Sequence, residues 1–175
     1  IVDENEIIKG DQIKEDSVLI GFKSSGLHTN GYSLARYVLF STYKIDDYIN
    51  ELGTTISEEL LKVHKSYLNL ITELKKIKHV QGFSHITGGG IIGNTKRIVP
   101  NGLGLDVTWD SWERPSIYSL IQDIGNVPEE DMRATFNLGI GLIAILDKSV
   151  VNKVLETAEK LGEPGYEIGR VKKNQ

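Results

Sequence analysis

Apolar and polar residues alternate along this chain in short blocks that predict strands and helices in irregular order. Compact or alternating apolar runs predict strands at residues 17–23, 83–86, 103–109, 136–146 and 166–171. Apolar residues spaced by three and four predict helices that begin near residues 32, 57, 91, 115 and 147. The longest of these, from Ser57 to Lys78, is the clearest amphipathic pattern, and residues 41–56 predict a surface excursion.

Residues typical of helix ends support these boundaries. Ser57 is followed by two acidic residues, as expected in a first helical turn. Pro115 suits the first position of a helix that Gly125 ends, and Asp147 can cap a last helix that Gly162 ends. Strands and helices thus interleave without strict alternation. This predicts an α+β fold, a three-layer sandwich of one mixed or antiparallel sheet with packed helices, as a single domain over residues 1–175.

Composition narrows the class of protein. The 175 residues carry a formal net charge of -4, which disfavours a nucleic-acid-binding surface spread over the whole domain. The absence of cysteine excludes disulfides and thiolate chemistry, and no run is long enough for a membrane helix. Residues 1–4 have no signal-peptide character and no initiating methionine. We therefore expect a cytoplasmic protein, and a piece of a longer chain.

The first segment with candidate chemistry is the polar stretch from Ser24 to Gly31, between a predicted strand and a predicted helix. It is either an ordinary Asn-Gly turn with capping hydroxyls or a loop that binds an anion or a ribose phosphate. The second is Ser84 to Asn94 with its three consecutive glycines. Successive N–H groups there can form a nest for phosphate, with Lys96 and Arg97 adding positive charge. A flexible loop or tight packing is the alternative.

The third segment, Thr135 to Gly141, has alternating glycines that favour close backbone packing, and Asn137 is its one side chain with a polar role in view. Other candidates are weaker. His64 and His79 are interpreted as structural or solvated. The tryptophans at 109 and 112 are interpreted as buried apolar surface, with a binding lid as the alternative. No His, Asp or Glu cluster has the spacing of metal ligands, so we expect no metal site in this chain.

Taken together and in this order, the three segments resemble the C-terminal domain of aminoimidazole ribonucleotide synthetase, the phosphoribosylformylglycinamidine cyclo-ligase family. The matching stretches are Ser24–Arg36, His85–Gly90 with Asn94 and Arg97, and Gly125–Asn126 through Thr135–Gly141, with an Ile-Ile-x-Gly turn at Ile7–Gly10. The family usually has proline at the position of Lys96 and often arginine at that of Ala134. No role is therefore transferred to the neighbouring Arg133.

The resemblance implies an ATP-dependent ligase of purine biosynthesis. ATP phosphorylates the amide oxygen of formylglycinamidine ribonucleotide, and the amidine nitrogen then closes the imidazole ring, giving aminoimidazole ribonucleotide, ADP and phosphate. Such chemistry needs positioning and charge neutralisation more than a protein nucleophile. The family's N-terminal half holds Mg²⁺ and most of the ATP site and forms most of the homodimer interface. We therefore expect this chain to be inactive alone and to have that half as its partner, with no nucleic-acid or membrane partner.

The resemblance also assigns candidate roles. We expect His28 and Asn30 to be catalytic, hydrogen-bonding the substrate. We expect substrate or phosphate binding at Ser24, Ser25, Gly26, Thr29, Gly31, Thr87, Gly88, Gly89, Gly90, Asn94, Arg97 and Asn137. The alternatives are another ATP-using enzyme of the superfamily (selenophosphate synthetase, thiamine-monophosphate kinase, the hydrogenase-maturation dehydratase or formylglycinamidine synthetase) and a noncatalytic ligand-binding domain.

Overall fold

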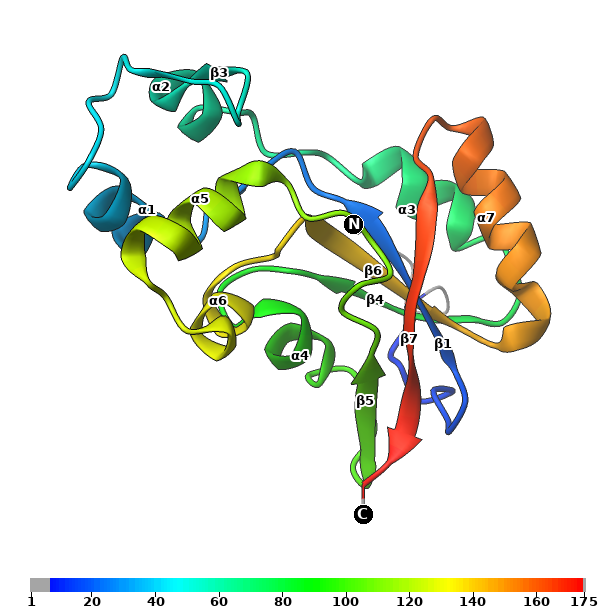
Figure 1. The fold of residues 1–175 in the computed structure, drawn as a ribbon. Coiled ribbons are helices and arrows are strands. Elements are labelled where there is room, and N and C mark those ends of the chain that lie inside the picture. The colour runs from blue at the N-terminus through cyan, green and yellow to red at the C-terminus, as the bar shows by residue number, and fades with distance from the viewer. Residues whose placement is uncertain (1–6, 175) are drawn as a thin grey trace.

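The computed structural model describes residues 7–174 and shows a five-stranded antiparallel sheet with helices on both faces (Figure 1). The strand order is β4-β6-β1-β7-β5. The strands are β1 (Val18–Lys23), β4 (Val80–His85), β5 (Leu103–Val107), β6 (Ile140–Leu146) and β7 (Gly165–Lys173). The predicted α+β class is confirmed, with the sheet antiparallel throughout its ladders.

The two central strands are buried on both faces, as their unbroken apolar sequences require. Every residue of β6 is buried, and β1 is buried up to Phe22. Ile20 of β1 lies opposite Ala144 of β6 and Glu167 of β7. Because both neighbours of β1 come from the C-terminal part of the chain, the sheet joins the two ends of the sequence.

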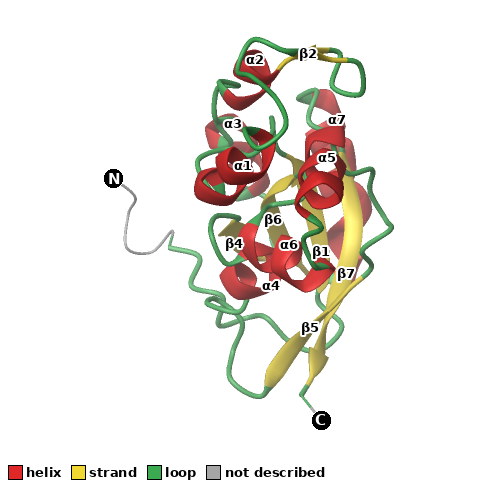
Figure 2. Cartoon of the chain, turned by 60° about the vertical axis from the view of Figure 1, so that its left-hand side comes forward, coloured by secondary structure: helices red, strands yellow, loops and turns green. Residues whose placement is uncertain are grey.

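Helices cover both faces of the sheet, and a different set of helices forms each layer (Figure 2). On one face, α3 (Leu68–Leu74) and α7 (Val151–Lys160) pack on Phe22 and Leu142, and a short 3₁₀ turn, η2 (Lys148–Val150), precedes α7. On the other face, α4 (Gly90–Thr95) packs against Leu19 and Ile143. A separate apolar cluster joins α1 (Tyr32–Leu39), α2 (Ile56–Leu60), α5 (Ser116–Gly125) and α6 (Glu129–Thr135).

The predicted helix from Ser57 to Lys78 is wrong. A capping box formed by Thr55 and Glu58 starts α2 at Ile56, and the chain leaves helical geometry after Leu60 until α3 begins at Leu68. Two hydroxyl groups from the N-terminal part of the chain donate hydrogen bonds to carbonyl oxygens at the end of α2 and just after it. Tyr32 donates to Leu60 O at 2.6 Å, and Ser25 donates to Val63 O at 2.7 Å. The segment 61–67 therefore exchanges helical hydrogen bonds for tertiary ones.

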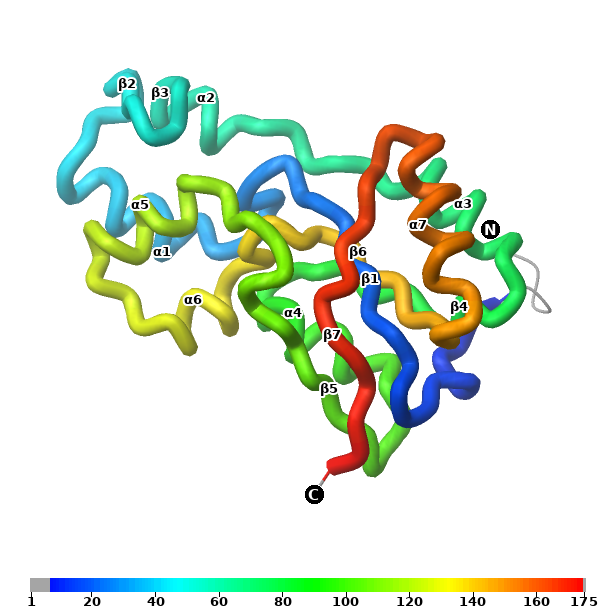
Figure 3. Tube along the Cα trace, turned by 45° about the vertical axis from the view of Figure 1, so that its right-hand side comes forward, coloured from blue at the N-terminus to red at the C-terminus, as the bar shows by residue number. Residues whose placement is uncertain are grey.

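Two further predictions need correction. The strand predicted from Phe136 begins only at Ile140, because Leu138 and Gly139 have φ of 50° and 99° and cannot continue a sheet. Helix α6 was not predicted, although Pro128 and three acidic residues mark its first turn. The predicted excursion at 41–56 projects from the body of the domain (Figure 3) and contains a short hairpin of β2 (Tyr48–Ile49) and β3 (Thr54–Thr55).

Strands β1, β5 and β7 lie within two residues of their predicted bounds, and α5 follows Pro115 as predicted. Residues 1–4, in which we expect no signal peptide, lie outside the described residues. Within residues 7–174, no helix has both the length and the apolar character needed to cross a bilayer.

Glu129 at the start of α6 ties that helix to α5 and to the segment before it. Its carboxylate accepts hydrogen bonds from both terminal nitrogens of Arg114, at 2.5 and 3.0 Å, from Arg133 Nε at 2.6 Å and from Gln122 Nε2 at 3.1 Å. Arg133 also lies over the ring of Trp109. The guanidinium of Arg114, foremost among these donors, lowers the pKa of Glu129 to about 2.

We predict that Glu129→Gln lowers the free energy of unfolding at pH 7 by about 1 kcal/mol, a modest value because the pair is partly solvated. A carboxyl group whose pKa is lower in the folded state than in the unfolded state stabilises the fold fully at pH values above its unfolded pKa. This stabilisation is lost as the pH falls from about 4.5 towards 2. Urea unfolding across pH 7 to 3 measures the gap between the two proteins. The difference in stability should narrow on acidification. Glu130→Gln, which removes a charge from the same helical turn but no ion pair in residues 7–174, should show a much smaller difference. A gap independent of pH would contradict this assignment.

Candidate functional site

The loop from Ser24 to Gly31, called here the first loop, joins β1 to α1 and is anchored from beneath by Asn137. Asn137 is buried, and its Nδ2 donates to Gly26 O at 2.9 Å. Its Oδ1 accepts from Ser24 Oγ at 2.9 Å and from Gly139 N at 2.8 Å. One side chain thus fixes the path of the first loop and the turn that precedes β6.

Tyr118 of α5 completes this arrangement. Its hydroxyl lies 2.6 Å from Asn137 Oδ1 and 2.9 Å from Gly26 O. The side chain is fully buried, and burial raises the pKa of the phenol, so it stays neutral and acts as a hydrogen-bond donor. Asn137 therefore has the polar role considered for it, but as a buried anchor rather than a group that faces a ligand.

The second predicted segment forms a tight loop from Thr87 to Gly90, called here the glycine loop, at the start of α4. Asn94 holds it: Nδ2 lies 3.1 Å from Thr87 O and 2.8 Å from Gly90 O, and Oδ1 accepts from Thr87 Oγ1 at 2.9 Å. Gly90 has φ of 63°, and a Cβ there would lie 1.8 Å from Arg133 O. Close packing on α6 therefore requires the third glycine.

This geometry leaves fewer N–H groups for the anion nest predicted for the glycine loop. The N–H of Gly89 donates to Ala134 O at 3.0 Å, and that of Gly90 donates to Thr87 O at 3.1 Å. Of the three glycines, Gly88 is the one whose N–H donates no backbone hydrogen bond within residues 7–174. Gly88 is exposed, and the side chain of Asn30 is its neighbour. Asn94 is likewise committed to the loop itself, which makes it a positioning residue.

The first loop and the glycine loop lie side by side. A Cβ at Gly88 would lie 3.5 Å from Asn30 Oδ1, and Gly88 and Gly89 are both exposed. The two loops are far apart in the sequence and follow different strands, so this contact is a product of the fold. Their adjacency creates a polar surface made of Thr29, Asn30 and the glycine loop, with two exposed backbone positions that a ligand can approach.

The remaining predicted residues have other places. Gly31 is required by packing, because a Cβ there would lie 2.2 Å from the ring of Phe136. Arg97 and Lys96 are exposed beyond the last residue of α4, Thr95, at the opposite end of that helix from the glycine loop. The prediction that these two residues add positive charge beside the glycine loop is therefore wrong, because they follow the far end of α4.

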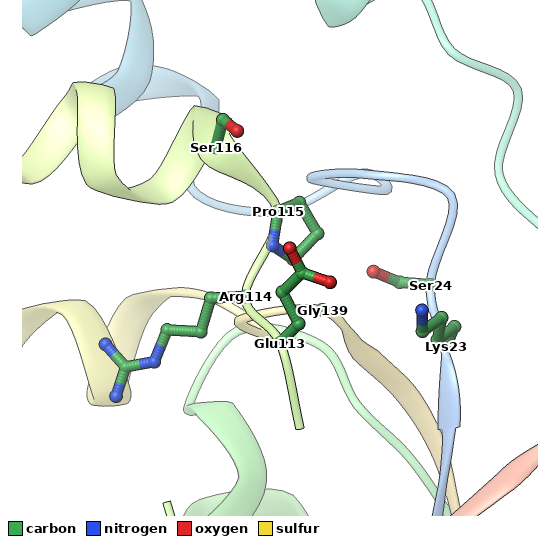
Figure 4. Close-up of a pocket in the computed structure, with 7 residues that line it drawn as sticks. All are labelled: Lys23, Ser24, Glu113, Arg114, Pro115, Ser116 and Gly139. Atoms are coloured by element: carbon green, nitrogen blue, oxygen red, sulfur yellow. The ribbon is translucent and has the colours of Figure 1, made fainter. Parts of the chain in front are cut away.

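A pocket of about 250 Å³ adjoins the start of the first loop (Figure 4). Lys23 and Ser24 line it from the end of β1, Gly139 lines it from the turn before β6, and Glu113 to Ser116 line it from the approach to α5. In Figure 4 the side chain of Arg114 extends away from Ser24, in keeping with its ion pair to Glu129. The sequence did not single out Lys23 or Glu113, because neither belongs to a recognisable motif.

Three histidines gather beside the first loop, although the sequence interpretation treated His64 as structural. The rings of His28 and His64 stack with centroids 3.9 Å apart. Nε2 of His64 lies 3.1 Å from Nε2 of His85, at the end of β4. His64 reaches this position because residues 61–67 are not helical, so the incorrect helix assignment concealed the cluster.

His28 is buried, and desolvation, followed by the proximity of His64 and His85, lowers its pKa to about 4. The N–H of Ser25 donates to Nε2 of His28 at 3.2 Å. Nδ1 is buried and has no hydrogen-bond partner within residues 7–174. His28 is therefore neutral at pH 7 and is covered by His64, rather than open to a ligand as the sequence led us to expect.

Comparison with known proteins shows that this chain is similar to proteins named phosphoribosylformylglycinamidine cyclo-ligase. It is 45% identical to the phosphoribosylformylglycinamidine cyclo-ligase of Acetivibrio thermocellus over 172 residues, which is 98% of this chain and 51% of that protein. It is 45% identical over 175 residues to the cyclo-ligase of Thermodesulfovibrio yellowstonii, covering 99% of this chain and 51% of the relative. The chain thus spans about half the length of these relatives.

Solved structures share the fold at much lower identity. A thiamine-monophosphate kinase from Stenotrophomonas maltophilia matches with a TM-score of 0.67 at 15% identity, over 99% of this chain and 53% of the other. The hydrogenase maturation protein HypE of E. coli matches with a TM-score of 0.59 at 16% identity, over 95% of this chain and 47% of the other. These likenesses establish the fold alone.

A family model described as "AIR synthase related protein, C-terminal domain" matches residues 14–175. That match spans every strand and helix described above, including both loops of the candidate site. The chain therefore belongs to the family of AIR synthase related C-terminal domains.

Proposed function

We propose that this chain is the C-terminal half of a phosphoribosylformylglycinamidine cyclo-ligase and supplies one wall of its substrate site. The single observation that supports this most is the adjacency of the first loop and the glycine loop, which meet at Asn30 and Gly88. These loops carry the motifs by which the chain resembles the cyclo-ligases. The relatives at 45% identity carry that name, whereas the structures with other functions are near 15% identity.

In this proposal, groups of the polar surface contact the substrate, while buried residues shape the surface. Asn30 and Thr29 offer side-chain hydrogen bonds, and the N–H of Gly88 is available beside them for an anionic oxygen. Asn94 and Asn137 hold the two loops in place. Rigid positioning of this kind lowers the entropic cost of aligning the amidine nitrogen with the activated carbon.

ATP and Mg²⁺ belong to the reaction through the other half of the enzyme. Mg²⁺ is bound by oxygen ligands such as carboxylates. Within residues 7–174, the one group of three or more metal-binding side chains consists of histidines, so these residues do not fit Mg²⁺. We therefore assign Mg²⁺ and most nucleotide contacts to an N-terminal half, which would also form a homodimer, and we expect this chain alone to be inactive.

The test is a chimera in which this chain replaces the corresponding half of the A. thermocellus enzyme. We expect ATP-dependent formation of aminoimidazole ribonucleotide from formylglycinamidine ribonucleotide, and none from either half alone. The comparison uses the parent enzyme under identical conditions. A folded, nucleotide-binding chimera without cyclisation would refute the proposal, as would turnover by this chain by itself.

We predict that Gly89→Val in the chimera lowers kcat/KM at least about a hundredfold, which corresponds to the loss of an aligned anion contact. Gly89 has φ of 103°, and a Cβ added there would have no neighbour nearer than Asn94 Nδ2 at 3.8 Å, so the substituted residue strains and redirects the loop rather than clashing. Gly102→Val is the matched control, with φ of 86° and open space outside the site. Equal losses in both variants would indicate a general effect of strain.

We predict that Asn137→Leu lowers the free energy of unfolding by roughly 2–4 kcal/mol, because it removes one hydrogen bond each from Gly26 O, Ser24 and Tyr118 and leaves the buried N–H of Gly139 without its partner. Tyr118→Phe, which removes a single hydroxyl, should cost about 1 kcal/mol. Urea unfolding of the isolated chain measures both. An Asn137→Leu protein as stable as the parent would show that the anchor has no energetic role.

A further inference from the structure

His28, His64 and His85 come from three segments that are distant in sequence: the first loop, the non-helical residues 61–67 and the end of β4. One ring nitrogen from each lies within 4.8 Å of the other two. We call this group the histidine cluster. The chain has four histidines in all, and the fourth, His79, is exposed just before β4 and lies outside the cluster.

We propose that the histidine cluster is a binding site for a divalent transition-metal ion, foremost Zn²⁺, with the three imidazoles as protein ligands and water in the remaining position. Three imidazoles with an open fourth position form a recognised Zn²⁺ arrangement. Neutral imidazole also suits Ni²⁺, Cu²⁺ and Co²⁺, whereas Mg²⁺ requires oxygen ligands. The site is therefore distinct in chemistry from the Mg²⁺ of the proposed reaction.

The distances are close to those that such an ion requires. With Zn–N bonds of about 2.0–2.1 Å, the nitrogens of a tetrahedral site lie roughly 3.3–3.4 Å apart. The Nε2 atoms of His64 and His85 are 3.1 Å apart, which is close to that spacing. Imidazole binds an ion in its ring plane, and the rings of His28 and His64 are stacked, so the His64 ring must turn for all three nitrogens to face one ion. Because the three nitrogens lie within 4.8 Å of one another, the most widely separated pair must close by about 1.5 Å at most to reach the same spacing. His64 lies on a non-helical segment and His85 is exposed, so both rings have room to adjust.

His28 supplies an independent reason to expect a ligand. Its Nδ1 is buried and has no hydrogen-bond partner in the described part of the chain, an arrangement that is costly unless another group satisfies it. Coordination through Nδ1 places the ring proton on Nε2 and gives up the contact from Ser25 N, which at 3.2 Å is at the long end of the usual range. Coordination therefore gives the unpaired buried nitrogen a partner and leaves the N–H groups of Ser25 and of His28 Nε2 facing each other, so the first loop adjusts locally when the ion binds.

The surroundings are close to electrically neutral. Lys65 is close enough to His28 to lower the pKa of that ring, and it is itself paired with Glu163. The ring of Tyr67 lies within 6.3 Å of the His28 and His85 centroids and donates its hydroxyl proton to Lys23 O. The positive charge of Lys65 is therefore balanced by Glu163 and repels a bound cation only weakly. It would also fasten the first loop to residues 61–67 and to β4.

The experiment titrates the purified, metal-free chain with Zn²⁺, and separately with Co²⁺, whose visible absorption reports coordination. We expect one ion per chain and, with Zn²⁺ at a hundred times its dissociation constant, a rise in Tm of roughly 5–10 °C. Mg²⁺ should produce neither effect. His64→Gln and His85→Gln should each weaken binding at least about tenfold, since each removes a ligand.

His79→Gln is the matched control and should bind Zn²⁺ like the parent. The partly exposed His64 and exposed His85 are preferred to the buried His28, so that loss of binding does not reflect loss of folding, which circular dichroism checks. Absence of saturable binding at micromolar Zn²⁺, or equal weakening by all three variants, would overturn the proposal. Because the readout is metal binding by this chain, the result is independent of whether the chimera catalyses cyclisation.

Discussion

The buried amide of Asn137 is the interaction on which the candidate site depends. It binds the carbonyl of Gly26 and accepts from Ser24, so the path of the first loop is set from below rather than by the loop's own turn sequence. An amide suits this position because it offers a donor and an acceptor to neighbours that are themselves shielded from water. The turn at Leu138 and Gly139, which interrupts the strand, also helps to place Asn137 beneath the first loop. A strand extended through these residues would carry residue 137 past the loop. The irregular backbone before β6 is therefore part of the site's construction.

The two loops differ in what holds them, and this difference assigns their roles. The glycine loop donates one N–H to its own Thr87 O and one to Ala134 O of α6, and Asn94 hydrogen-bonds its carbonyl groups, so its exposed backbone is held in place by the protein itself. The first loop keeps Thr29 and Asn30 at the surface while its buried part is fixed. A surface built in this way presents few groups, but it presents them in constant positions. This suits one wall of the proposed substrate site, whose remaining contacts we assign to an N-terminal half.

Much of the fold was predictable because burial on two faces leaves a clear signature in β1 and β6. The ordered motifs likewise drew attention to the two loops that the proposed site uses. The break after α2 was not predictable, because Leu60, Val63 and Tyr67 keep helical spacing although the carbonyls there bond to distant hydroxyls. Without that break, the convergence of His64 with His28 could not be foreseen. The roles of Asn94 and Asn137 as anchors also depend on depth of burial, which single-sequence patterns do not specify.

The position of β1 at the centre of the sheet has a consequence for how the protein is made. β1 is the first strand of this sheet to be synthesised, yet its partners on either side, β6 and β7, are among the last elements. Closing such distant contacts carries a loop-entropy cost before any sheet energy is gained, which slows folding relative to helical proteins of similar length. During translation β1 therefore remains an unpaired apolar strand until the ribosome has released the C-terminal residues. Chaperones that bind exposed apolar segments protect such a strand over that interval.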